Sequence, residues 1–188
     1  QPRGEHPKPQ FMRDSWLNLN GEWDFAFDFG VSGLERGWER DPSAFDRKIV
    51  VPFCPESRLS GLAHTDFIPA CWYRRSFSVP ANWKDRRVFL RLGGVDFDCR
   101  AWVNGQAVGR HTGGSSSFEF EITRALRDGD NEVVVAVLDD VRSDVQPSGK
   151  QCPDYHSRDY LYTRVTGIWQ TVWLEARPSS YLDFVRVV

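Results

Sequence analysis

Residues 162–175, YTRVTGIWQTVWLE, are the part of the sequence that decides the fold class. Gly167 supplies the backbone freedom with which a loop can end. After it, the side chains of residues 168–175 alternate with a period of two, which is typical of a β-strand. One face of this strand carries Trp169 and Trp173, which is unusual for a face that meets only water. The stretch therefore predicts a loop that runs into a strand.

Short segments of the same kind follow one another along the chain. Asn20-Gly21 and Asn104-Gly105 are turn signals, and the second is a pair that favours a tight hairpin. Thr123 is expected to cap a single helical turn. The absence of an internal repeat and the many short strands predict an all-β sandwich. The segment 131–139 is apolar on both faces and is therefore expected to be a central strand. Residues 182–188 begin another apolar run. The expected strands are 17–28, 49–53, 71–79, 87–92, 97–104, 106–110, 118–123, 131–139 and 168–175.

Composition excludes several functional classes. The chain has 188 residues and a net charge of −2, which fits one domain and gives no charge-driven attraction to nucleic acid or to an anionic membrane. Aromatic residues make up 14% of the chain and include eight Trp. Indole rings stack on the C–H faces of sugars, but they also fill the cores of β-sandwiches, so this excess leaves both interpretations open.

The reactive side chains show no spacing typical of a cofactor site. The four cysteines include no C-x-x-C pair and the four histidines have no metal-like spacing, so neither a metal nor any other cofactor is predicted. The glycine pairs lack the G-x-x-x-x-G-K pattern of a phosphate loop. No signal peptide, lipidation site or membrane span is recognised. The protein is expected in the cytoplasm, with its cysteines as reduced thiols.

A loop of about 25 residues, 141–166, is expected to carry function, because loops of this length in compact domains are usually functional or disordered. Within it, residues 146–166 offer rings for stacking and carboxylates for hydroxyl groups. The alternative is a solvated loop whose tyrosines pack on the sandwich. The candidate sugar or interface contacts here are Asp159, Tyr160, Tyr162 and Arg164, followed by Trp169 and Trp173 on the strand.

Several motifs together resemble one enzyme family. They are LNGEWDF at 19–25, VP at 51–52, WYRRSF at 72–77, VNGQAVGRHTGGSSSFEFEIT at 103–123 and TGIW at 166–169. Over nearly all of residues 14–175 the chain resembles the N-terminal domain of glycoside hydrolase family 2, which comprises β-galactosidases, β-glucuronidases and β-mannosidases. It departs from the family pattern at Glu121, where an aspartate is usual, and by one position at the arginine of WYRRSF.

The resemblance implies a galactose-binding-like jelly roll over residues 14–178, after an arm at 1–13 and before a linker or Ig-like domain that starts at 179–188. It implies a parent enzyme that cleaves a terminal β-glycoside with retention, and an oligomer of identical chains as a further partner. In the family, both catalytic glutamates lie in a following TIM barrel. Two loops of the N-terminal domain, here 146–166 and 56–70, reach that active site, and by position in the motif their sugar-contacting acids correspond to Asp159 and Asp66.

Catalysis by this chain alone is not expected. Retaining hydrolysis needs two carboxyl groups about 5–5.5 Å apart. Asp96 and Asp98 resemble the start of a strand, and Asp139 and Asp140 are adjacent in sequence, so their side chains would point apart in a strand. The GGSSS stretch lacks the G-x-S-x-G pattern of a serine nucleophile. We therefore assign no catalytic residue.

Two other functions remain open at this point. The chain could be a free-standing carbohydrate-binding module that uses Trp169, Trp173 and the loop tyrosines as a platform, or an assembly domain without a ligand. Galactoside, glucuronide and mannoside specificity are not separated by this domain, because in the family the barrel decides them.

Overall fold

The structure is a computed structural model that describes residues 1–143 and 145–183. Strands dominate, and the only helices in this part of the chain are short 3₁₀ turns. The strands are β1 (Trp16–Asn18), β2 (Gly21–Phe27), β3 (Arg47–Val51), β4 (Ala70–Ser78), β5 (Arg87–Leu92), β6 (Val95–Asp96), β7 (Asp98–Val103), β8 (Gln106–Thr112), β9 (Phe118–Glu121), β10 (Asp130–Leu138), β11 (Gly167–Ile168) and β12 (Val172–Arg177). The 3₁₀ turns are η1 (Pro9–Phe11), η2 (Trp38–Arg40), η3 (Pro42–Ala44), η4 (Arg58–Ser60), η5 (Ala81–Trp83) and η6 (Thr123–Ala125).

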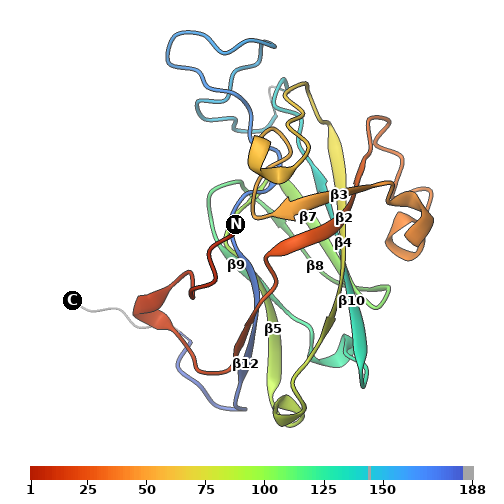
Figure 1. Ribbon diagram of the computed structural model, residues 1–188, viewed down its shortest axis with the longest axis vertical. Coiled ribbons are helices and arrows are strands. Elements are labelled where there is room, and N and C mark those ends of the chain that lie inside the picture. Colours follow the sequence, from red (N-terminus) through yellow and green to blue (C-terminus); the bar gives the residue numbers. More distant parts are fainter. Residues whose placement is uncertain (144, 184–188) are drawn as a thin grey trace.

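The strands form two main layers with the core between them (Figure 1). A six-stranded sheet has the order β3-β2-β4-β10-β7-β8, and a four-stranded sheet has the order β1-β12-β5-β9. A two-stranded pair, β11-β6, lies near the end of the sandwich from which the long loops project. All named strand pairs are antiparallel. The predicted all-β jelly-roll sandwich is confirmed.

Strand β10 is the central strand that its sequence predicts. It pairs with β4 along its whole length and with β7 on its other side. Val133, Val135 and Val137 enter the core between the sheets. Val134 and Ala136 face outward, where a second apolar cluster that includes residues of the 29–45 loop covers them. Both faces of the strand are therefore buried, which explains its apolar sequence.

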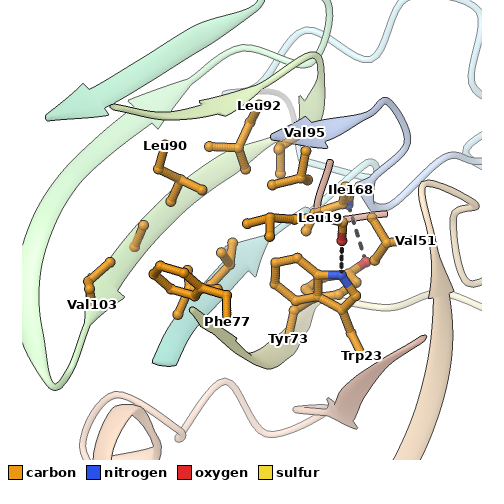
Figure 2. Close-up of a cluster of buried hydrophobic side chains, with 14 of the residues drawn as sticks. Leu19, Trp23, Val51, Tyr73, Phe77, Leu90, Leu92, Val95, Val103 and Ile168 are labelled. Atoms are coloured by element: carbon orange, nitrogen blue, oxygen red, sulfur yellow. Dashed lines mark hydrogen bonds between the residues drawn. The ribbon is translucent and has the colours of Figure 1, made fainter. Parts of the chain in front are cut away.

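The core contains large aromatic side chains whose polar atoms have partners (Figure 2). The indole Nε1 of Trp23 donates a hydrogen bond of 2.8 Å to the carbonyl of Leu19. The hydroxyl of Tyr73 accepts a hydrogen bond of 3.2 Å from the backbone N–H of Ile168. Because a buried polar group without a partner costs free energy, these two bonds let the rings fill the core without that penalty.

The single strand predicted at 168–175 is two strands. β11 pairs with β6, and β12 pairs with β5 from Val172 onward. The partner strands are interrupted as well, because Gly93 and Gly94 lie between the end of β5 and the start of β6. Opposite this break, the N–H of Trp169 donates a hydrogen bond of 3.2 Å to the Gly94 carbonyl. A Cβ at Gly94 would lie 2.9 Å from the Trp169 ring, so the two segments approach too closely for a side chain at this position.

Two local predictions have different outcomes. The hairpin at Asn104-Gly105 is confirmed, since both residues have positive φ values, 52° and 76°, between β7 and β8. The helical turn near Thr123 exists as η6, but Thr123 does not cap it, because Ile122 occupies the N-cap position without a side-chain bond. The Thr123 hydroxyl instead accepts a 2.9 Å hydrogen bond from the N–H of Val88 and so joins η6 to β5.

The N-terminal arm, residues 1–13, lies against the outer face of the four-stranded sheet. His6 is buried there, and its Nε2 lies 3.6 Å from a carboxylate oxygen of Glu175. Arg13 lies 3.4 Å from the other oxygen of the same carboxylate. The arm also contains η1, which the sequence did not indicate. At the other end, residues 179–183 contain no strand or helix, and 184–188 of the expected linker and apolar run lie outside the described residues.

Gly167 provides a stability test of this fold. Its φ is +74°, and a Cβ there would lie 2.1 Å from the Tyr73 hydroxyl. Gly167→Ala should therefore add a clash to left-handed strain and lower the free energy of unfolding by about 2–5 kcal/mol. Gly129→Ala is the matched control, because Gly129 has φ +83° and no atom within 4 Å of a Cβ. Equal losses for the two variants in chemical denaturation would show that the contact with Tyr73 is unimportant.

Candidate functional site

Two long loops project from the same end of the sandwich. Figure 1 shows the 146–166 loop (blue) extending beyond the strands, beside the segment that carries η4. Hydrogen bonds confirm that the loops are neighbours, because the Arg164 guanidinium donates to the Thr65 carbonyl and the Thr166 N–H donates to Glu56. The two loops that the family resemblance points to, 56–70 and 146–166, therefore meet in space.

Residues 153–161 form a lobe at the tip of the second loop. The chain closes this lobe by hydrogen bonds between the backbone of Tyr162 and that of Lys150 and Cys152, each 2.8 Å long. Tyr160 and Tyr162 are 69% and 63% exposed, so their rings are available for contact. The alternative expected a solvated loop whose tyrosines pack on the sandwich. The loop is exposed as expected, but the exposure of these two rings contradicts their packing.

The two predicted sugar-contacting acids are both exposed in the loops. Asp159 has a positive φ of 53°, and its carboxylate lies 3.9 Å from the Arg158 guanidinium. Arg158 is more closely paired with Asp154, at 2.7 Å. Asp66 is exposed and accepts a 2.7 Å hydrogen bond from the N–H of the following residue. Both carboxylates are thus exposed and able to meet a ligand.

A pocket of about 650 Å³ opens at the foot of the lobe. Half-buried Trp169 lines it, and its indole Nε1 is fixed by a 2.8 Å hydrogen bond to the Gly114 carbonyl. Buried Asp96 lies on the same wall and accepts a 2.8 Å hydrogen bond from the side chain of Gln151. The other lining residues are Phe97, Gly113, Ser115, Ser116, Pro147, Ser148, Gly149, Lys150 and Val165. The pocket thus places an aromatic ring beside a carboxyl and an amide, groups that can orient a small polar ligand.

Three buried carboxyl groups hold the foot of the 146–166 loop. Glu56 accepts the N–H of Thr166 at 3.1 Å, and Asp139 accepts the hydroxyl of the same threonine at 2.9 Å. Asp139 also accepts from the side chain of Gln146 at 2.6 Å. Burial raises the pKa of each of these two carboxyls above its ordinary value. Loss of solvation, together with the charges of Asp139 and Glu56, raises the pKa of Asp96 to about 7.

Two residues expected to contact sugar have structural roles instead. Trp173 is fully buried, and its Nε1 donates a 2.9 Å hydrogen bond to Glu175 beneath the N-terminal arm. Arg164 is 3% exposed and donates to four backbone carbonyls. Because neither side chain has a free surface, we correct both expectations. Trp169 keeps a half-buried ring at the pocket and remains a candidate.

Asp96, Gln151 and Glu56 were missed as site residues by the sequence analysis. Asp96 was considered only as a partner of Asp98, yet Asp98 pairs with Arg110 at 2.7 Å. The other carboxyl pair is also split, because the side chain of Asp139 is buried and that of Asp140 is exposed. A signal was present, since Asp96 lies two residues after the glycine pair that ends an apolar strand. Its partner, 55 residues away, leaves no local pattern.

The remaining expectations concern metals and membranes. No group of three or more His, Cys, Asp or Glu residues in the described ranges is arranged to hold a metal ion. All four cysteines are free thiols. No helix in this part of the chain is long and apolar enough to span a membrane.

The protonation of Asp96 gives a pH test. Its pKa of about 7 lies above the ordinary value of 3.8, so the folded state holds a proton that the unfolded state releases between these values. This stabilisation is complete below pH 3.8 and is lost as the pH rises to about 7. Asp96→Asn should flatten the fall in melting temperature over this interval. An unchanged pH dependence of melting in the variant would contradict a buried, protonated Asp96.

Comparisons with known proteins agree with the fold. Residues 16–178 match the family model described as glycosyl hydrolases family 2, sugar binding domain. The chain is 34% identical over 125 residues to a β-galactosidase of Thermoanaerobacter pseudethanolicus, a match that covers 65% of the chain and 16% of that protein. It is 28% identical over 192 residues to a β-glucuronidase of Rattus norvegicus, with coverages of 90% and 30%.

A solved structure of a β-glucuronidase also matches the fold of this chain. A β-glucuronidase of an uncultured Clostridium sp. superposes with a TM-score of 0.65 at 26% identity, over 90% of this chain and 30% of that one. The chain therefore spans only 16% to 30% of the length of these relatives.

Proposed function

Because the chain belongs to the sugar binding domain family of the family 2 glycosyl hydrolases, we propose that it is the non-catalytic N-terminal domain of a longer glycosidase. The parent enzyme would hydrolyse terminal β-glycosides with retention, as β-galactosidases and β-glucuronidases do. The short span of the match on both curated relatives supports a larger enzyme. The partners proposed within that enzyme are an Ig-like domain and a TIM barrel, in an oligomer of identical chains in the cytoplasm.

The placement of the carboxyl groups supports a non-catalytic role. A retaining enzyme needs two carboxyls that face one sugar from about 5–5.5 Å apart. The buried carboxyls described here are bonded to the foot of the loop, with Glu56 and Asp139 both engaged by Thr166. Asp98 is paired with Arg110 and not with Asp96. The reacting acid and nucleophile would therefore come from the barrel.

The pocket at the foot of the lobe is the observation that carries the proposal. Trp169 would stack on the C–H face of a sugar, and Asp96 would bond a hydroxyl group, with Gln151 holding its carboxyl in place. Asp159 and Asp66 would add contacts from the exposed loops above. The domain would thus complete one side of an active site whose catalytic groups lie elsewhere.

A free-standing carbohydrate-binding module is the less favoured function. That function requires Trp169 and Trp173 to form a common platform, and Trp173 is fully buried. The exposed lobe tyrosines are the observation that keeps an assembly domain as the other alternative.

Sugar binding by the isolated chain separates these functions. A partial site makes one or two hydroxyl contacts worth about 0.5–1.5 kcal/mol each, far below the roughly 8 kcal/mol of a micromolar complex. We expect millimolar or weaker affinity for free sugars in titration calorimetry, and no hydrolysis of aryl β-galactoside, β-glucuronide or β-mannoside. Micromolar binding would favour the free-standing module, and turnover by contaminant-free chain would refute the missing-barrel assignment.

The loop acid is tested in the full-length enzyme. If Asp159 accepts a hydrogen bond from a sugar hydroxyl, Asp159→Asn should lower kcat/KM roughly 10- to 200-fold, because bonds to charged groups are worth about 1.5–3 kcal/mol. The melting temperature should barely change, since this side chain is exposed. The measurements are steady-state kinetics and thermal melting.

The controls follow from the ion pairs of the lobe. Asp154→Asn releases Arg158 and so tests the lobe without removing Asp159. Asp85→Asn, an exposed acid beside η5 (Ala81–Trp83), should be silent. A loss for Asp154→Asn but not for Asp159→Asn would move the contact to Asp154, and three silent variants would remove the lobe from substrate binding.

A further inference from the structure

We propose that Arg164 is a positioning residue that joins the loops 56–70 and 146–166 into one rigid unit and so fixes the spacing of their sugar-contacting acids. Its effect on hydrolysis rests on the proposed function, whereas the joint itself can be measured in the isolated chain.

The guanidinium group of Arg164 donates hydrogen bonds to four backbone carbonyls. Nη1 bonds the carbonyls of Cys152 and Asp154, at 3.1 and 2.6 Å. Nη2 bonds the carbonyl of Tyr155, at 3.2 Å, and that of Thr65. Cys152 directly precedes the lobe, Asp154 and Tyr155 belong to its start, and Thr65 belongs to the other loop. One buried side chain therefore bonds both loops at once.

The planar fork of arginine suits this arrangement. Its two terminal nitrogens carry four N–H donors in fixed directions, and the four carbonyls use them. Lysine has three donors on one atom and could not reproduce the geometry. The guanidinium carbon of Arg164 also lies 4.3 Å from the centre of the Phe67 ring, which belongs to the 56–70 loop. Packing and hydrogen bonding thus act on the same two loops.

The joint lies next to both predicted sugar-contacting acids. Thr65 directly precedes Asp66, and the bonded carbonyls of Cys152, Asp154 and Tyr155 lie where the lobe that carries Asp159 begins. A second bond, from the Thr166 N–H to Glu56, joins the loops at the foot. With two ties, a shift of one loop moves the other. A displacement of about 1 Å in a substrate-positioning group can cost about 100-fold in rate.

Hydrogen exchange in the isolated chain tests the joint. The N–H groups of His64 and Cys152 report on the two loops, because they bond backbone carbonyls at 2.9 and 2.8 Å. Arg164→Ala should speed exchange at both sites at least tenfold, and added guanidinium ion, which has the same donors as the group removed, should restore protection. Arg142→Ala is the matched control, since Arg142 lies 4.2 Å from the same Phe67 ring. It should change neither rate.

Kinetics of the full-length enzyme test the consequence. Arg164→Ala should lower kcat/KM about 100-fold, and guanidinium ion should recover much of the loss, which a general loss of folding would not allow. If the alanine variant does not fold, Arg164→Lys keeps the charge and stem; it should speed exchange in both loops and lower kcat/KM.

Each outcome decides one part. Faster exchange at Cys152 alone, with His64 unchanged, would overturn the joint. Faster exchange at both sites with unchanged kcat/KM would overturn the positioning role. If Asp159→Asn leaves kcat/KM unchanged while guanidinium ion restores the kcat/KM of Arg164→Ala, only the assignment of Asp159 is overturned.

Discussion

The contact between Gly167 and the Tyr73 hydroxyl fixes where the long loop ends and the core begins. Only a residue without a Cβ can approach this hydroxyl so closely, and the next residue, Ile168, donates its N–H to the same oxygen. The approach sets β11 against β6 in a register that places Gly167 opposite Asp96. The pocket carboxyl and the loop terminus are thus positioned by one contact, and the Trp169 ring that follows lines the same pocket.

Buried charge at this end of the sandwich is distributed differently from that under the N-terminal arm. Under the arm, Glu175 meets the arginines Arg91 and Arg13 and the imidazole of His6. At the loop end, carboxyls accept N–H and O–H groups of the loop itself, while the Arg164 cation bonds carbonyls. Because buried charges need partners, removing a partner from either group should loosen the segment it holds. This arrangement explains how a long loop keeps a defined shape.

The sandwich could be predicted from the sequence because its signals are local. The period of two placed Val172 and Leu174 in the core and Trp173 on the opposite face, and the Asn104-Gly105 pair specified its hairpin. The break at 169–171 depends on the approach of Gly93 and Gly94 from a distant strand, so periodicity could not show it. The burial of two other side chains also depends on remote segments. The N-terminal arm covers Trp173 through His6, and the Thr65 carbonyl binds Arg164. Family motifs found the two loops, but not the pocket residues Asp96 and Gln151, whose contact joins β6 to the long loop.

The most direct test of this account is a structure of the full-length enzyme with its glycosyl intermediate trapped by a slowly hydrolysed fluoroglycoside. We expect the sugar to be bonded covalently to a carboxylate outside residues 1–188, with a carboxyl of the loop end, Asp96, Asp159 or Asp66, within about 2.5–3.0 Å of a sugar hydroxyl. A covalent bond to a residue of this domain would contradict the non-catalytic role. A trapped sugar that touches no residue of the pocket or of either loop would contradict the claim that the domain completes the active site.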